Sequence, residues 1–198
     1  MQILLFSPKS AASRSGNWTT ASRWRKQLES AGHRVKLCTD PGLQQFGNAD
    51  MLIGLHAKRS AKIVMRFKRL TPDRPALIAL TGTDLYRDLP SGRNIATMIR
   101  ALDACDQIVT LQPLMNRKLF PRWKSKTAVV MMDVPKGTFT RRKFKQGSLK
   151  VCVVGHLRKE KDPFRTEMAV RNLPANIASA SSTLAVRFRH ATVNSHRK

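Results

Sequence analysis

Short runs of apolar residues recur along most of the chain, and stretches with helical periodicity lie between several of them. Runs of this length between polar turns are typical of the buried strands of a parallel sheet. The predicted strands are residues 2–7, 33–38, 50–56, 75–80, 107–112 and 127–132. This alternation of strand and helix predicts an α/β fold, a Rossmann-like doubly wound parallel sheet with helices on both faces.

The predicted helices are recognised by apolar residues three or four positions apart. Trp18, Ala21 and Leu28 show this spacing in the first of them. A second helix is predicted from the apolar positions within residues 63–70, and a third for residues 95–104.

The pattern indicates more than one structural region. Residues 1–133 are expected to form the first domain, and residues 134–150, which are basic and have no periodicity, a linker. Residues 151–176 begin a new strand and helix, as at the start of a second domain. Residues 177–198 have no acidic residue and no alternation that would join a sheet, so we expect a disordered tail.

The charge balance limits the class of partner. The chain of 198 residues carries 37 Lys and Arg against 12 Asp and Glu, a net charge of +25. The electrostatic field of so large a positive charge attracts nucleic acid, anionic lipid or phosphorylated small molecules. No apolar run approaches the length of a membrane span, and the first residues lack the features of a signal peptide, so we expect a soluble, cytoplasmic protein.

The three cysteines, Cys38, Cys105 and Cys152, are widely separated in the sequence. Their spacing fits reduced, buried thiols rather than a metal site, and no metal is expected.

A polar loop after the first predicted strand is a candidate binding loop, because ligands of open parallel sheets bind at the carboxyl ends of the strands. It contains Ser15, Gly16 and Asn17 at the start of a helix, where exposed amides attract an anion. An ordinary turn with Asn17 as the N-cap is the alternative interpretation.

Two further loops converge on the same edge of the predicted sheet. His56 follows the third strand and could act as a base or bind a substrate, although a structural histidine is the alternative. Thr81, Gly82, Thr83 and Asp84 follow the fourth strand. Asp84 could contact a ligand or cap the next helix. The convergence of three loops indicates a binding site more strongly than any one of them.

A fourth candidate lies in the second predicted domain. Gly155 ends a strand, and Arg158 and Lys161 precede a helix. Cations beside a helix N-terminus can bind a diphosphate and stabilise it as a leaving group. A solvated basic turn is the alternative.

The segments SRSGN, LHAKRSA, ALTGTDLYRDLP, VTLQP and VCVVGHLRKEKDPFR occur in this order along the chain. Together they resemble the selenosugar synthases of selenoneine biosynthesis, which are glycosyltransferases built from two Rossmann domains. The resemblance extends from Met1 to about Pro174. It implies transfer of a sugar from a UDP-sugar to selenophosphate without a metal or cofactor.

The resemblance also implies roles for individual residues. His56 and Asp84 would be catalytic, and Arg158 and Lys161 would bind the phosphates of the donor. The residues that would line the cleft on the acceptor side are Ser15, Gly16, Asn17, Arg59, Thr81, Gly82 and Thr83.

The chain departs from this family after about residue 176. Family members continue with a complete second domain and a glycine-rich donor segment, and no similar segment occurs here. We therefore expect a truncated protein with little or no transferase activity. Alternatives are a glycosyltransferase for another acceptor, a first domain that works with a separate partner, and a basic nucleic-acid-binding protein. No recognised nucleic-acid-binding motif is present, so no specific nucleic acid is expected.

Overall fold

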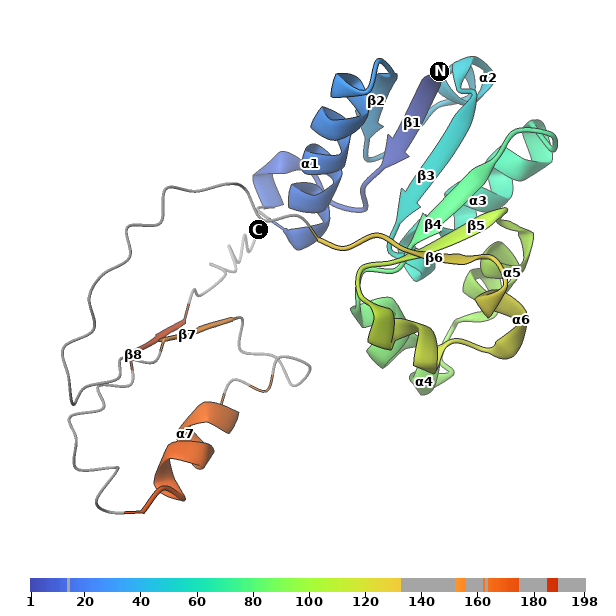
Figure 1. Ribbon diagram of the computed structural model, residues 1–198. Helices are drawn as coiled ribbons and strands as arrows, with labels where there is room; N and C mark the ends of the chain where they lie inside the picture. Colours follow the sequence, from blue (N-terminus) through green and yellow to red (C-terminus); the bar gives the residue numbers. More distant parts are fainter. Residues whose placement is uncertain (14, 133–151, 156–161, 163, 175–184, 189–198) are drawn as a thin grey trace, which may run out of the picture. The chain divides into compact units, whose positions relative to one another are not determined.

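The computed structural model describes residues 1–13, 15–132, 152–155, 162, 164–174 and 185–188 (Figure 1). The chain divides into two compact units, Met1–Val134 and Pro135–Lys198. The residues expected to form a linker, 134–150, lie outside the described ranges.

The first unit is built on a six-stranded, all-parallel sheet, which confirms the predicted Rossmann-like α/β fold. Its strands are β1 (Gln2–Phe6), β2 (Arg34–Cys38), β3 (Met51–Leu55), β4 (Ala76–Ala79), β5 (Gln107–Thr110) and β6 (Thr127–Val129). Their order across the sheet is β2-β1-β3-β4-β5-β6. The central strands are buried along almost their whole length, because both faces of the sheet are covered there.

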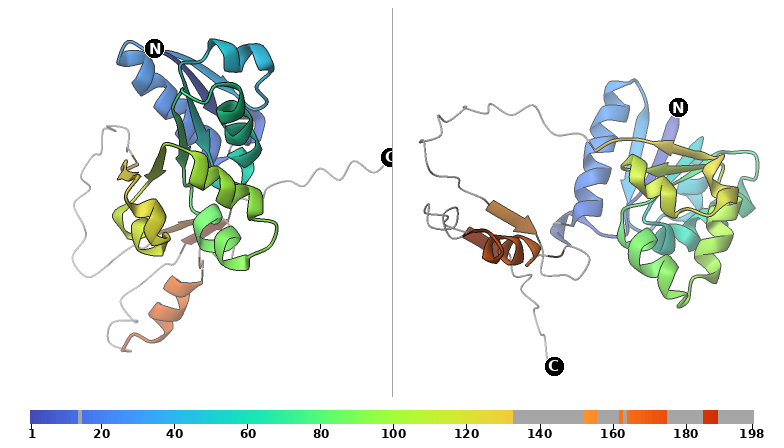
Figure 2. Two further views of the ribbon diagram at one scale, coloured as in Figure 1. Left: turned by 90° about the vertical axis from the view of Figure 1, so that its right-hand side faces the viewer. Right: turned by 60° about the horizontal axis from the view of Figure 1, so that its bottom comes forward.

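Helices cover both faces of this sheet, as Figures 1 and 2 show. The helices are α1 (Gly16–Ser30), α2 (Leu43–Asn48), α3 (Ala57–Leu70), α4 (Leu89–Ser91), α5 (Ala96–Ala104) and α6 (Pro121–Lys124), with the 3-10 segments η1 (Ala11–Ser13) and η3 (Pro113–Lys118) and the π-helical turn η2 (Asp84–Asp88). One apolar cluster joins α1 to its face of the sheet, and a larger one joins α2, α3, α5 and α6 to the other face.

Helix α3 matters most for the site, because it begins directly after β3. Val64 and Phe67 on its apolar face are fully buried, as the helical periodicity predicts. Its first turn passes close to the backbone of Gly54 in β3. A Cβ atom at Gly54 would lie only 2.8 Å from the Cβ atom of Ser60, so the close approach requires glycine.

The last strand of the sheet is shorter than predicted. Residues 127–132 were expected to be extended, but β6 ends at Val129, and Met131 is exposed. β6 is an edge strand that pairs only with β5, so few contacts hold its continuation to the sheet. Helix α2, which the sequence pattern did not predict, has only six residues. It is too short to show helical periodicity.

The described part of the second unit contains β7 (Cys152–Gly155), α7 (Arg165–Arg171) and β8 (Ala185–Phe188). β8 pairs in parallel with β7. The expectation that no part of residues 177–198 joins a sheet is therefore wrong at these four residues. A strand this short offers too few positions for an alternating pattern to be recognised.

Within the described ranges, we find no helix whose length and apolarity would allow it to cross a membrane.

Candidate functional site

The candidate site lies where the direction of the chain connections reverses. The chain leaves β1 towards β2 on one side and leaves β3 towards β4 on the other, so the carboxyl ends of β1 and β3 form a topological switch point. Ligands of open α/β sheets bind at such points. Because β1, β3 and β4 are neighbours, the loops predicted to be functional start from adjacent strands.

His56 joins β3 to α3 and is buried, with 3% of its surface exposed. Its φ angle of 69° is in the left-handed region, which is uncommon for a residue with a Cβ atom. Its Nε2 atom lies within hydrogen-bonding distance of Thr83 Oγ1, at 3.1 Å. Its backbone carbonyl accepts from the amides of Arg59 and Ser60 and from the Ser60 hydroxyl. The contact with Thr83 holds the imidazole ring against the loop after β4, and the carbonyl bonds hold the backbone of His56 to the first turn of α3.

The Asp84 carboxylate is fully buried and accepts hydrogen bonds from four backbone amides. The donors are the amides of Ala57, Thr81, Gly82 and Leu85, at 2.9–3.1 Å. The bond to Ala57 places a negative charge at the N-terminus of α3, where the helix dipole is positive. Asp84 thus joins the β4 loop to the start of α3. This arrangement favours a positioning role for Asp84 over direct contact with a substrate.

Asp88 belongs to the same cluster, although the sequence analysis did not identify it. Its Oδ2 atom lies 3.8 Å from His56 Nε2, and its Oδ1 atom accepts a hydrogen bond from Arg87 Nε at 3.0 Å. The π-helical turn η2 brings Asp88 to this position, with the Leu89 amide bonded to the Asp84 carbonyl. π-Helical turns are rare and often occur at functional sites. The only sequence signal is a second aspartate four positions after Asp84.

The environment of His56 keeps its imidazole neutral near pH 7. Burial lowers the pKa of His56 from its ordinary value of 6.5, because desolvation disfavours the charged ring. The carboxylates of Asp84 and Asp88 oppose this shift of the pKa, and the nearby Arg59 adds to it. A neutral imidazole can accept a proton.

Two buried side-chain atoms in this cluster have no hydrogen-bond partner within the described part of the chain. They are His56 Nδ1 and Thr81 Oγ1. Asp84 Oδ2, at 3.9 Å, is the closest carboxylate oxygen to His56 Nδ1 but is beyond hydrogen-bonding distance. Buried polar atoms are usually paired, so unpaired ones need an explanation such as a bound ligand.

The loop after β1 lies at the same edge of the sheet. Ser15 is the N-cap of α1, because its hydroxyl accepts a hydrogen bond from the Trp18 amide at 3.3 Å. The alternative in which Asn17 is the N-cap is therefore wrong, since Asn17 is already inside the helix. A Cβ atom at Gly16 would meet no other atom within 4 Å, so the space beside this glycine is open.

The structure thus brings together only part of the predicted site. His56, Thr81, Gly82, Thr83 and Asp84 form one cluster, and the amide of Arg59 is bonded to His56. Within the described residues of the loop after β1, Ser15 and Asn17 make no hydrogen bond to this cluster. Arg158 and Lys161, the predicted donor-phosphate ligands, lie outside the described residues.

The cysteines whose side chains the structure describes are free thiols. Burial raises the pKa of Cys38 and of Cys105 to about 11, so both are protonated and poorly nucleophilic at neutral pH. The described residues also contain no cluster of three or more His, Cys, Asp or Glu side chains that could hold a metal ion.

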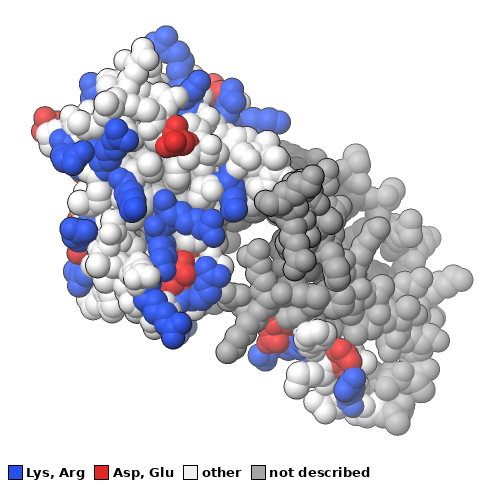
Figure 3. Space-filling model, turned by 180° about the vertical axis from the view of Figure 1, so that it is seen from behind, with Lys and Arg blue, Asp and Glu red and all other residues white. Residues whose placement is uncertain are grey.

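Basic side chains are distributed over the face of the first unit shown in Figure 3, with a few acidic side chains between them. A comparison with protein-family models gave no match, and a search of curated proteins gave none. The fold and the geometry of the site are therefore the basis for a functional assignment.

Proposed function

We propose that this chain is a glycosyltransferase-like protein of the selenosugar synthase type, whose first unit binds the anionic acceptor selenophosphate. The observation that carries this proposal is the neutral, buried His56 at the switch point of the sheet, paired with Thr83. The segments that contain these residues, LHAKRSA and ALTGTDLYRDLP, are among those that resemble the family.

In the proposed reaction, the selenium of selenophosphate attacks the anomeric carbon of a UDP-sugar. A carbon–selenium bond forms while the carbon–oxygen bond to UDP breaks, and UDP leaves with the bonding electron pair. His56 would take up a proton from the acceptor or orient it by a hydrogen bond. Arg59 would supply positive charge near the acceptor. Arg158 and Lys161 would stabilise the diphosphate as its charge develops.

Asp84 and Asp88 have different tasks in this proposal. Asp84 holds the β4 loop against α3 and so keeps Thr83 beside His56. Asp88 would stabilise the imidazolium ring once His56 has gained a proton, because its carboxylate lies 3.8 Å from Nε2.

Calorimetry of the full chain would test acceptor binding, with thiophosphate as a stable probe of selenophosphate. We expect saturable binding that His56→Asn weakens by about tenfold, the effect of one lost charge-assisted hydrogen bond. The matched control is His33→Asn, at a half-buried histidine outside the cluster. Equal binding by the wild type and both variants would place the anion elsewhere.

Mass spectrometry would test the transfer itself, after incubation of the chain with selenophosphate and a panel of UDP-sugars. A selenium-linked sugar that depends on both substrates would support the assigned reaction, and its robust formation would contradict the expectation that this chain has little or no transferase activity. If thiophosphate binds but every sugar is transferred to another acceptor, the fold and site are those of a glycosyltransferase of different specificity. If neither substrate binds and single-stranded DNA does, the basic surface serves nucleic acid instead.

A further inference from the structure

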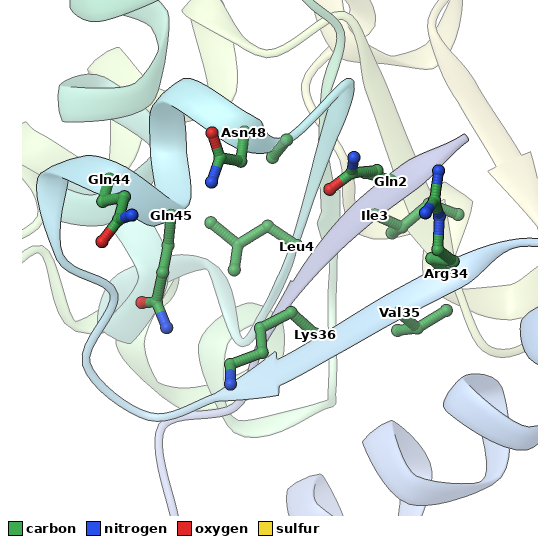
Figure 4. Close-up of a pocket in the computed structure, with 10 residues that line it drawn as sticks. Gln2, Ile3, Leu4, Arg34, Val35, Lys36, Gln44, Gln45 and Asn48 are labelled. Carbon is green, nitrogen blue, oxygen red and sulfur yellow. The ribbon is translucent and has the colours of Figure 1, made fainter.

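A groove of about 440 Å³ lies at the other end of the sheet from His56 (Figure 4). It is lined by the first residues of β1 and β2 and by one side of α2. All strands are parallel, so this is the amino-terminal end of the sheet, opposite the switch point. The volume is within the range of small-molecule sites.

The groove follows from the alternation of side chains along β2 and from the length of α2. Arg34 and Lys36 point to the same face of the sheet because they are two residues apart. Val35 and Leu37 point to the opposite face and pack on the cluster that contains α1. β2 is the edge strand, and the six-residue α2 buries Phe46 in the same cluster as Leu4 of β1. The face of β2 that carries Arg34 and Lys36, on the same side of the sheet as α2, is therefore left uncovered.

Arg34 and Lys36 are exposed cations without an ion pair. Neither makes a side-chain hydrogen bond or salt bridge within the described residues, and no acidic residue lines the groove. The nearest acids in sequence, Glu29 and Asp40, do not line the groove. Asp50, whose carboxylate accepts a hydrogen bond from the Gln2 amide at 2.7 Å, is not part of the lining either. These two exposed cations supply positive charge to one wall of the groove, which favours an anionic ligand.

The opposite wall of the groove carries uncharged amides. Gln44, Gln45 and Asn48 come from α2, and Figure 4 shows their amide groups across from the side chains of β2. The Gln45 Oε1 atom already accepts a hydrogen bond from the Gly42 amide at 3.0 Å, so its NH₂ group is left to donate. Between the two walls lies the buried, apolar Leu4. Amide side chains can recognise the donors and acceptors of a base or a similar polar group.

We propose that this groove binds a small phosphorylated organic molecule of about mononucleotide size. Arg34 and Lys36 pair with the phosphate, and the amides of Gln44, Gln45 and Asn48 bond to the uncharged polar part above Leu4. This site is separate from the acceptor site at His56 and does not depend on its function.

Calorimetry with the full chain at fixed ionic strength tests this site, with UMP, AMP and inorganic phosphate as probes. The test variant is Arg34→Gln with Lys36→Gln. The matched control is Arg69→Gln with Lys62→Gln, which removes the same charge from exposed positions on α3. We expect one saturable mononucleotide site that the test variant weakens by about tenfold or more and the control by less than about twofold.

Further measurements distinguish binding in the groove from binding that follows the net charge of the protein. Asn48→Ala should weaken the binding of UMP or AMP but not that of inorganic phosphate. Equal losses in the test and control variants would overturn the proposal, because binding would then follow net charge. It is also overturned if phosphate binds as tightly as the mononucleotides, or if single-stranded DNA binds and mononucleotides do not.

Discussion

Polar side chains are buried and hydrogen-bonded at the carboxyl end of the sheet but exposed at its amino end. At the carboxyl end, His56 and Asp84 are buried, and the Asp84 carboxylate is bonded to four backbone amides. At the amino end, Arg34 and Lys36 are exposed and have no ion pair within the described residues. The side chains at the carboxyl end are therefore part of the packed, hydrogen-bonded structure, whereas the cations of the groove contribute little to the stability of the fold. Substitutions should consequently affect stability strongly at the first end and weakly at the second.

The largest effect is expected for Asp84→Ala. It would leave four backbone amides without their acceptor, and loss of a buried charged partner destabilises a protein by about 3–5 kcal/mol. Urea unfolding followed by tryptophan fluorescence measures this, since Trp18, Trp24 and Trp123 all lie in the first unit. The control is Asp73→Ala, at an exposed position. If both variants unfold at the same urea concentration, Asp84 does not hold the site together.

A pair of glycines gives the next largest contrast. Gly54→Ala should destabilise the fold by about 1–3 kcal/mol, because the new Cβ atom would lie 2.8 Å from Ser60 Cβ and displace the start of α3. Gly47→Ala, in α2 beside the groove, meets no atom within 4 Å and should be neutral or stabilise the helix by up to about 1 kcal/mol. Thermal unfolding of both variants measures the difference, and a stable Gly54→Ala protein would contradict the close packing.

The buried histidine should make stability depend on pH. Because burial lowers the pKa of His56 in the folded state, the unfolded chain binds a proton that the folded chain does not as the pH falls below about 6.5. The stability that neutral His56 contributes is present above this pH and is lost below it, with a slope of at most about 1.4 kcal/mol per pH unit. Unfolding free energies measured from pH 8 to pH 5 should fall less for His56→Asn than for the wild type. Parallel profiles would show that His56 is not the responsible group.

A smaller loss of about 1 kcal/mol is expected for Ser15→Ala. This change removes the hydroxyl that caps α1 at the Trp18 amide. Ser22→Ala, inside the same helix, should instead stabilise slightly, because alanine has the higher helix propensity. Urea unfolding distinguishes the two by the opposite signs of their effects, and equal signs would contradict the assignment of the cap.

The smallest effect is expected at the groove. Arg34→Gln with Lys36→Gln should change the free energy of unfolding by no more than about 0.5 kcal/mol, as exposed substitutions usually do. The same calorimetric samples used for ligand binding can be unfolded thermally. A large loss of stability would show that these cations support the fold, and the contrast between the two ends of the sheet would disappear.

The candidate site was predictable in its position but not in its internal contacts. The apolar runs locate the strands, and the carboxyl ends of adjacent parallel strands must share an edge, so His56 and the Thr81–Asp84 loop could be placed together. The bond between His56 and Thr83 could not be foreseen, because it depends on the left-handed backbone of His56. The position of Asp88 beside His56 depends on a π-helical turn, and such turns have no recognisable sequence pattern.

The sequence alone determined the class of the fold, the central strands and the main helices of the first unit, since periodicity and apolar runs report local burial. Tertiary structure decided which polar groups are buried with partners and which stay exposed. Asp84 could be read as a ligand or a cap until its four amide donors were placed around it, and Arg34 and Lys36 alternate with apolar residues as in any edge strand.

The groove exists because α2 is too short to cover β2. The pairing of β7 with β8 likewise joins segments far apart in the chain. Such contacts depend on the positions of several elements at once, and no local pattern encodes them.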